Sequence, residues 1–174
     1  MAKIFLLGFM GSGKSTIGSA LAKKMSYNFI DLDDLIVQNS GLAIPVIFDK
    51  KGEPYFRQIE SASLKSLAAV SHTIVALGGG TPCFFDNMQW INQHGVSVYL
   101  ATSTDVLVER LKKETAQRPL LQSLSAARLP TYIEEKLAER TPFYQQAHLH
   151  YFTTTGCEPI VDELYHFFKQ MAKK

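Results

Sequence analysis

A glycine-rich stretch near the start of the chain, Gly8–Ser15 with the sequence GFMGSGKS, constrains the fold more than any other feature. It follows the short apolar run Ile4–Leu7 and precedes a helical pattern that begins at Thr16. Closely spaced glycines let the backbone turn sharply and direct successive N–H groups inward, which creates a concave site for anionic oxygens. The order of strand, glycine-rich loop and helix therefore predicts a nucleotide-phosphate site, and an ordinary turn before a helix is the alternative.

Two side chains at the end of this loop suit phosphate chemistry. Lys14 supplies a compact positive charge on a long stem. Ser15 places a hydroxyl in the first turn of the helix, where a phosphate-bound Mg²⁺ can use it as a ligand. The N–H groups and partial positive charge at the helix N-terminus favour the same anions. The expected phosphate-binding residues are Gly11, Ser12, Gly13, Lys14, Ser15 and Thr16.

The length and composition of the chain predict a single domain spanning residues 1–174. Of its 174 residues, 46% are hydrophobic and 20% are charged, which is ordinary for a soluble globular protein. A net charge of +2 gives no general nucleic-acid footprint, and no apolar run approaches the roughly 20 residues of a membrane span. Cys83 and Cys157 lack ligand-like spacing and are expected to be reduced thiols. We therefore expect a cytoplasmic protein with neither nucleic-acid nor membrane partners.

A group of acids follows the second expected strand, Tyr27–Ile30. Carboxylates such as Asp31 and Asp33, just beyond the C-terminal end of a strand in an α/β domain, lie at the edge where ligands bind. Alternatively, either one caps the expected helix Leu35–Asn39, while Asp34 serves as a charge at the helix N-terminus. The phosphate loop upstream favours the functional interpretation, because a magnesium–nucleotide site needs a carboxylate near the metal.

Residues 41–56 are expected to form a loop with a short helix, after which a longer helix opens at Phe56 and passes Leu67. Arg57 and Glu60 are three residues apart on one face of that helix, so the carboxylate can hold the guanidinium in one orientation. A fixed guanidinium matches a carboxylate ligand with paired donors. The alternative is an exposed ion pair that contributes little, and the sequence by itself favours that alternative.

Three consecutive glycines, Gly78–Gly80, end the apolar run Thr73–Leu77. The run has the character of a buried parallel strand. Glycines at the end of such a strand allow a ligand to approach the backbone closely, whereas a merely flexible connection is the alternative. No acid ends this strand, so a metal-side carboxylate falls to Asp31.

The second half of the chain continues the alternation of strands and helices. The expected elements are a helix at Phe85–Gln93, a strand at Val96–Leu100, a helix capped by Ser103 or Thr104, a helix from about Ser125 that Pro142 weakens, a strand at His148–Thr153 and a helix from Pro159. Residues 112–124 carry basic and amide side chains without apolar periodicity, which is typical of a lid. Five strand–helix units predict a parallel sheet with helices on both faces.

Six motifs in this order resemble the shikimate kinase family over essentially the full length of the chain. They are GFMGSGKS at Gly8–Ser15, DLD at Asp31–Asp33, FRQIE at Phe56–Glu60, GGG at Gly78–Gly80, RPLL at Arg118–Leu121 and RTPFY at Arg140–Tyr144. The resemblance implies a three-layer α/β/α P-loop kinase fold with a five-stranded parallel sheet in the order 2-3-1-4-5. It also implies ATP-dependent phosphorylation of the 3-hydroxyl of shikimate, a step of aromatic amino acid biosynthesis, with Mg²⁺ as cofactor. A monomer is expected.

The resemblance also implies roles on the side of the phosphate donor. Lys14 and the loop amides would hold the phosphates of ATP. Ser15 would ligate Mg²⁺, and Asp31 would support the metal through water. Arg118 would be the lid arginine that reaches the transferring phosphate, and Arg110 matches the region that holds adenine.

On the acceptor side the resemblance implies a substrate-binding region at about residues 32–61 and further residues downstream. Asp33 would accept the proton of the attacking hydroxyl. Arg57 and Arg140 would bind the substrate carboxylate. The supporting residues would be Glu60, which orients Arg57, and Gly79 and Gly80, which line the site.

Two other functions remain open at this stage. Another small-molecule P-loop kinase, such as a gluconate kinase, shares the loop and an acid after the second strand but does not need two arginines for a carboxylate. A GTPase-type switch is the second, and the chain lacks the NKxD motif that reads guanine.

Overall fold

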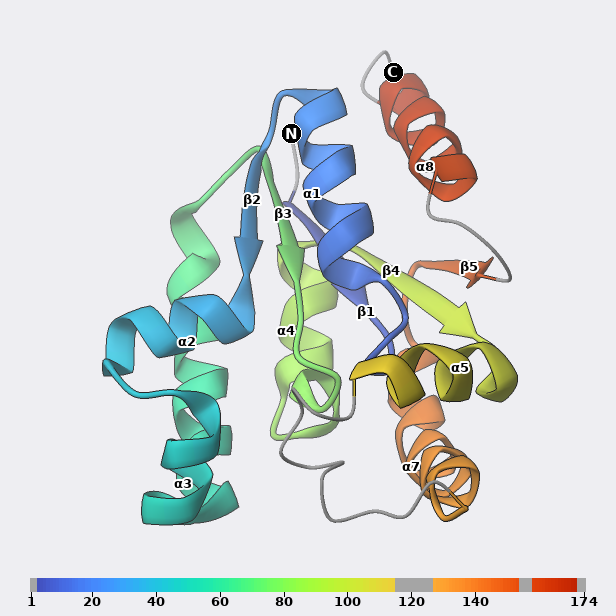
Figure 1. The fold of residues 1–174 in the computed structure, drawn as a ribbon. Helices are drawn as coiled ribbons and strands as arrows, with labels where there is room; N and C mark the ends of the chain where they lie inside the picture. The colour runs from blue at the N-terminus through green and yellow to red at the C-terminus, as the bar shows by residue number, and fades with distance from the viewer. Residues whose placement is uncertain (1–2, 115–126, 154–157, 172–174) are drawn as a thin grey trace.

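The structure, a computed structural model, describes residues 3–114, 127–153 and 158–171. Its centre is a five-stranded parallel sheet in the order β2-β3-β1-β4-β5 (Figure 1). The strands are β1 (Lys3–Leu7), β2 (Asn28–Asp31), β3 (Thr73–Ala76), β4 (Gly95–Thr102) and β5 (Leu149–Thr153). The predicted strand order and the parallel arrangement are thus confirmed.

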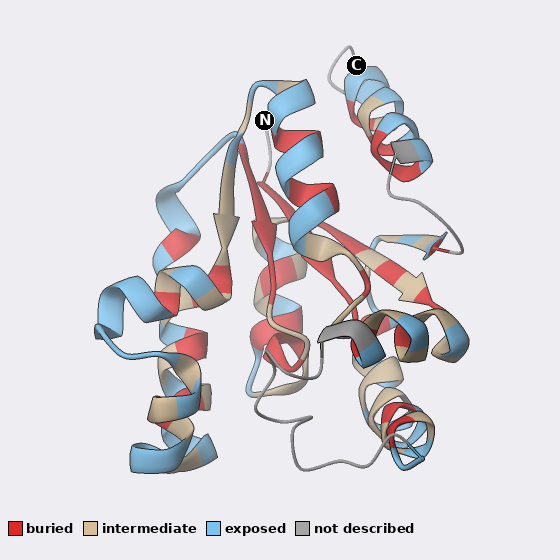
Figure 2. Cartoon of the chain, viewed as in Figure 1, coloured by how far each residue is buried: buried red, intermediate tan, exposed pale blue. Residues whose placement is uncertain are grey.

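Helices cover both faces of the sheet, and their burial follows the side they turn to it (Figure 2). The α-helices are α1 (Lys14–Met25), α2 (Leu32–Ser40), α3 (Ile44–Ser66), α4 (Asn87–His94), α5 (Thr104–Glu114), α7 (Leu129–Tyr144) and α8 (Glu158–Met171). Two short 3₁₀ helices are η1 (Leu67–Ala69) and η2 (Thr81–Cys83). Within the described residues, no helix is both long and apolar enough to cross a membrane.

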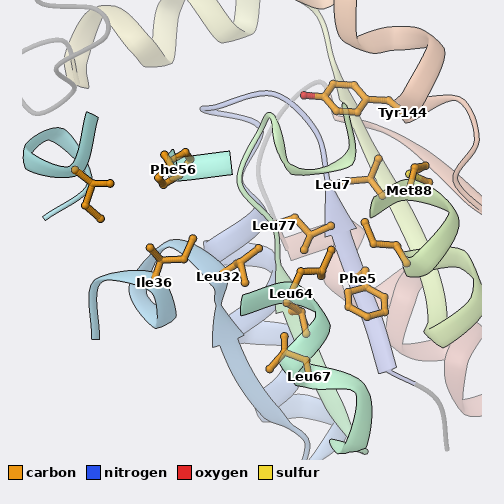
Figure 3. Packing of buried hydrophobic residues seen from close by; sticks show 13 residues of the cluster. Phe5, Leu7, Leu32, Ile36, Phe56, Leu64, Leu67, Leu77, Met88 and Tyr144 are labelled. Carbon is orange, nitrogen blue, oxygen red and sulfur yellow. The ribbon is translucent and has the colours of Figure 1, made fainter. Parts of the chain in front are cut away.

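Alternation along β1 gives the sheet two separate cores. Phe5 and Leu7 point to one face, where they join residues of α2, α3, α4 and α7 (Figure 3). Ile4 and Leu6 point to the other face, where they join residues of α1 and α8. Successive side chains of a strand face opposite sides, so a continuously apolar strand such as β1 is expected to be buried on both.

The region between β2 and η1 is more helical than its sequence predicts. The helix after β2 begins at Leu32 instead of Leu35, and α3 occupies most of the expected loop. Gly52, with φ 79° and ψ 168°, introduces a kink that separates the two halves of α3. Pro54 lies just after this kink. Glycine and proline here therefore mark a bend between two helical segments and not a loop.

In the second half of the chain, two helices extend further than the sequence predicts. Helix α5 continues to Glu114, so the first residues of the predicted lid are helical, whereas the rest of that segment, with Arg118, lies outside the described residues. Helix α7 continues past Pro142 to its end at Tyr144, although the proline was expected to weaken it. Cys83 is a free thiol as predicted, and Cys157 lies outside the described residues.

Candidate active site

The loop between β1 and α1 turns on glycines with left-handed or unusual backbone angles. The φ angles of Gly8, Gly11 and Gly13 are 145°, 80° and 93°. At Gly8 a Cβ atom would also lie 2.8 Å from the carbonyl oxygen of Leu100, so the position is closed to any side chain. Ser12 is buried, and its hydroxyl has no hydrogen-bond partner within the described structure. A bound anion can offset the cost of such an orphaned donor, about 1–3 kcal/mol, by accepting its hydrogen bond.

Two cationic side chains hold the backbone of the loop by hydrogen bonds to its carbonyl oxygens. Lys14 donates from Nζ to the carbonyl oxygens of Gly8 and Phe9, both at 2.9 Å. Arg110 on α5 donates from Nη1 to the carbonyl oxygen of Gly11, also at 2.9 Å. Arg110, which was predicted near adenine, therefore contacts the backbone of the phosphate loop itself.

Asp31 at the end of β2 serves two partners at once. Its Oδ1 accepts the backbone N–H of Asp33 at 3.1 Å, so Asp31 is the N-cap of α2. Its Oδ2 accepts the Ser15 hydroxyl at 2.6 Å. The capping interpretation is thus correct for Asp31, and the same carboxylate also accepts a hydrogen bond from Ser15, the other residue predicted to lie beside the metal. Asp33 and Asp34 lie in the first helical turn, where acids favour the helix dipole.

Asp33 is an unusually basic carboxylate. Burial and, after it, the negative charges of Asp31 and Glu60 together raise its pKa from 3.8 to about 6, while the Lys14 ammonium acts in the opposite direction. A carboxylate with this pKa is mostly ionised at neutral pH and holds a proton more readily than an ordinary aspartate. These are the properties that a general base near neutral pH requires.

The Arg57–Glu60 pair is largely shielded from water, with its side chains 11% and 1% exposed, so its interpretation as an exposed surface pair is wrong. Arg57 Nη1 donates to Glu60 Oε2 at 2.9 Å, and the Glu60 side chain is only 1% exposed. The Nε and Nη2 atoms of Arg57 donate to Glu53 Oε1 on the exposed side. The guanidinium also lies over the Phe84 ring, 4.2 Å from its centroid. Four groups therefore contact the Arg57 guanidinium, namely Glu60, Glu53, Phe84 and Phe56, whose ring centroid lies 5.1 Å from Cζ.

The triple glycine makes room for two arginines. A Cβ atom at Gly80 would lie 2.8 Å from Arg57 Nη1, and one at Gly79 would lie 3.1 Å from Arg140 Nη1. The Tyr144 hydroxyl donates to the Gly79 carbonyl oxygen and ties this turn to the end of α7. Figure 3 shows Tyr144 in the core that also holds Leu7 and Leu77. The three glycines therefore form a turn that is closely packed against the arginines and held by Tyr144, and not a flexible connection.

A cleft of about 490 Å³ opens between the phosphate loop and the triple glycine. Its lining residues are Met10, Gly11, Gly13, Lys14, Ser15, Thr16, Asp31, Asp33, Asp34, Leu77, Gly78, Gly79 and Arg110. Other predicted site residues, namely Ser12, Arg57, Glu60, Gly80 and Arg140, are not part of this lining. Gly78 connects the two groups, because a Cβ atom there would lie 2.8 Å from Glu60 Oε1 and 3.1 Å from Asp33 Oδ1.

Sequence reasoning missed four polar residues behind the site. Thr81, Asn87 and Ser61 form buried hydrogen bonds that lead to Glu60, and Tyr144 holds Gly79. Thr81 follows the triple glycine directly, and that position was the one available signal. Asn87 and Ser61 resemble ordinary helix residues in the sequence, because nothing local indicates which polar side chain is buried.

The order of the sheet and the phosphate loop after its central strand place the chain among P-loop kinases that act on small molecules. The model of the shikimate kinase family matches residues 10–170. The chain therefore belongs to the shikimate kinase family.

Proteins described as shikimate kinases are similar to this chain over most of their length. The shikimate kinase of Phocaeicola vulgatus is 44% identical over 147 residues, which are 84% of each chain. The crystal structure of the Bacteroides thetaiotaomicron shikimate kinase has a TM-score of 0.91 at 36% identity, covering 97% of this chain and 98% of that one. The Acinetobacter baumannii shikimate kinase in complex with shikimate has a TM-score of 0.91 at 31% identity, covering 100% and 96%.

A gluconokinase from Sinorhizobium meliloti is also similar, with a TM-score of 0.64 at 21% identity over 99% of this chain and 94% of that one. At this identity the likeness concerns the fold alone.

Proposed function

We propose that the chain transfers the γ-phosphoryl group of ATP to the 3-hydroxyl of shikimate, giving shikimate 3-phosphate and ADP. Membership of the shikimate kinase family supports the reaction. The observation that carries the proposal for the site is the convergence of Asp33, Arg57 and Arg140 on the triple glycine opposite the phosphate loop. A base beside two guanidiniums suits an acceptor that has both a hydroxyl and a carboxylate.

On the donor side, the loop amides, Lys14 and the Ser12 hydroxyl would bind the phosphates. Within the described residues no three His, Cys, Asp or Glu side chains gather as a metal cluster. Mg²⁺ bound to nucleotide usually keeps several waters and takes one or two protein ligands, so Ser15, with Asp31 acting through water, fits it. When bound, Mg²⁺ would neutralise charge on the β- and γ-phosphates.

On the acceptor side, Arg57 and Arg140 would hold the carboxylate of shikimate while Asp33 accepts the proton of the attacking hydroxyl. Arg118, outside the described residues, would bring a further positive charge to the transferring group. Phosphoryl transfer depends mainly on positioning and charge neutralisation, which is what these groups provide. We still predict that the protein is a monomer, that it consists of a single domain and that it lies in the cytoplasm.

An ADP-release assay tests the proposed function with shikimate, gluconate and the methyl ester of shikimate as acceptors. We expect good turnover with shikimate, a large loss with the ester because its charge is absent, and none with gluconate. Turnover with gluconate and not with shikimate would refute the proposal. A preference for GTP over ATP in a binding titration would instead favour a nucleotide switch.

The pH dependence of the reaction should follow the protonation of Asp33. Because the pKa of this carboxyl is about 6, the base is lost as pH falls through that value. We expect kcat/KM for shikimate to decrease below pH 6, approaching about tenfold per pH unit. Initial rates from pH 8 to 5 measure this, with circular dichroism as a control for folding. A flat profile down to pH 5 would contradict the assignment of Asp33 as base.

Replacing Arg57 with lysine should weaken binding of the acceptor. An ammonium cannot reproduce the paired donors or the stacking on Phe84, so we expect KM for shikimate to rise about 10–100-fold while KM for ATP stays within about twofold. The matched control is Glu53→Gln, which removes the negative charge on the exposed side of Arg57 and keeps an oxygen that can accept its hydrogen bonds. Steady-state kinetics with both substrates decide, and an unchanged KM for shikimate in Arg57→Lys would remove Arg57 from the site.

A further inference from the structure

A chain of buried hydrogen bonds extends behind Arg57 and joins three elements. Glu60 Oε2 accepts a hydrogen bond from Arg57 Nη1, and the other oxygen, Oε1, accepts the Thr81 hydroxyl at 2.7 Å. The Thr81 carbonyl oxygen accepts Asn87 Nδ2 at 2.9 Å. Asn87 Oδ1 in turn accepts the Ser61 hydroxyl at 2.7 Å. Helices α3, η2 and α4 are thus connected from Ser61 to the guanidinium of Arg57 through side chains and the backbone carbonyl of Thr81.

These groups are shielded from water almost completely. Thr81 and Asn87 are 0% exposed, Glu60 is 1% exposed and Ser61 is 7% exposed. A buried carboxylate needs a partner for each oxygen, since water cannot replace a missing donor. The Thr81 hydroxyl therefore determines how the Glu60 carboxylate is rotated, and that rotation sets the direction in which Oε2 meets Arg57.

Thr81 also belongs to the turn that accommodates Arg57. It follows Gly80 directly, and the absent Cβ of Gly80 leaves the space that the guanidinium fills. The backbone N–H of Thr81 donates to the Gly78 carbonyl oxygen at 3.1 Å, which closes this turn. One residue therefore controls both the partner of Arg57 and the turn beside it.

We propose that Thr81 is a positioning residue whose hydroxyl orients Glu60 and thereby fixes Arg57 for the acceptor carboxylate, with Asn87 and Ser61 holding Thr81 in place. This inference rests on the proposed function, because it concerns how the same site recognises its acceptor. Thr81 itself does not touch the acceptor in this arrangement.

A second polar link between α3 and the start of α4 lies on the exposed surface. Lys65 on α3 pairs with Asp86, the residue just before α4, on the exposed surface. That pair spans the same two helices without reaching Glu60. It provides a control for effects that come only from the packing of these helices.

Replacing Thr81 with valine keeps the shape of the side chain and removes the hydroxyl, whereas Thr81→Ser retains it. We expect Thr81→Val to raise KM for shikimate about tenfold, with kcat and KM for ATP within about threefold of wild type. Thr81→Ser should restore KM for shikimate to within about twofold of wild type, and the surface control Lys65→Met should leave all three constants unchanged.

A double variant separates positioning from simple destabilisation. If Thr81 acts through Arg57, then Thr81→Val combined with Arg57→Lys should have the same KM for shikimate as Arg57→Lys alone, because residues acting as one unit are not additive. Should Thr81→Val fail to fold, Ser61→Ala takes its place, since it removes the hydroxyl that donates to Asn87 without placing a charge in the buried chain, and an unchanged KM for shikimate in that variant then overturns the inference.

The outcomes distinguish this inference from the proposed function. Absence of shikimate turnover in the wild-type protein defeats the proposed function. With an active wild type, an unchanged KM for shikimate in Thr81→Val, or equal increases of KM for both substrates, overturns the inference alone. A serine variant as impaired as the valine variant also overturns it, because the hydroxyl would then not be the relevant group.

Discussion

Replacing Asp33 with asparagine is expected to lower kcat by about 10²–10⁴-fold, because the neutral amide cannot accept the proton of the attacking hydroxyl. Binding of ATP should change little, since the substitution leaves unchanged the loop and Lys14, which we propose hold the phosphates. Kinetics at saturating substrate and a nucleotide titration measure the two effects. A wild-type kcat would remove Asp33 from the mechanism.

The same variant should be more stable than wild type at neutral pH. The pKa of Asp33 is raised from 3.8 to about 6, so the folded protein holds this proton more tightly than the unfolded chain does. The stabilisation linked to that proton is fully present below pH 3.8 and is lost as pH rises through 6. Above pH 6 the buried charge therefore costs up to about 3 kcal/mol, which asparagine avoids.

Calorimetry of the ligand-free protein tests this stability effect. We expect the melting temperature of Asp33→Asn to exceed that of wild type by several degrees at pH 7.5, at about 2–4 °C per kcal/mol, and the difference to shrink between pH 6 and pH 4. The matched control is Asp34→Asn, in the same helical turn but exposed. A lower melting temperature for Asp33→Asn at pH 7.5 would contradict the argument.

Replacing Lys14 with methionine is expected to reduce kcat/KM for ATP by about 10²–10³-fold. The variant keeps the length of the side chain but removes the charge that would meet the phosphates, and preorganised charge of this kind is worth that much in the transition state. It also removes two hydrogen bonds to the loop carbonyls of Gly8 and Phe9. Lys24→Met, at the exposed end of the same helix, is the control.

The Lys14 variant has a second, independent readout. The ammonium of Lys14 lowers the pKa of Asp33, so its removal should move the acid limb of the kcat/KM profile to higher pH. A loss of less than about tenfold in kcat/KM together with an unmoved acid limb would show that Lys14 contributes to neither half of the site.

Much of the architecture can be predicted from local patterns in the sequence. The apolar run of β1, the glycines after it and the helical spacing of α1 predict the phosphate loop because each depends on neighbouring residues only. The strand order follows from the family resemblance and is confirmed. Local patterns failed at Gly52 and Pro54, where tertiary packing lets helix resume on both sides of a kink.

The site was harder to predict where burial decides the role of a residue. The spacing of Arg57 and Glu60 is the same for an exposed pair and a buried one, and only the packing of α3 against η2 shows that Glu60 is shielded. The link from Glu60 through Thr81 to Asn87 joins residues that are distant in sequence, which no periodicity can reveal. For Asp31 the capping interpretation is confirmed, and its second oxygen accepts the Ser15 hydroxyl, whereas its role beside a metal stays a prediction.

The two cores on opposite faces of the sheet support different parts of the candidate active site. The core below α2, α3, α4 and α7 contains Phe56, Leu77 and Met88, each next to a residue of the acceptor side or of its support. The core below α1 and α8 contains Ile17 and Leu21, which anchor the helix that carries the phosphate loop. A substitution in the second core is therefore expected to affect the nucleotide side through α1, whereas one in the first core, which also contains Leu7 directly before the phosphate loop, can affect both substrates. The nucleotide side thus depends on the packing of both faces of the sheet, and the acceptor side mainly on that of one face.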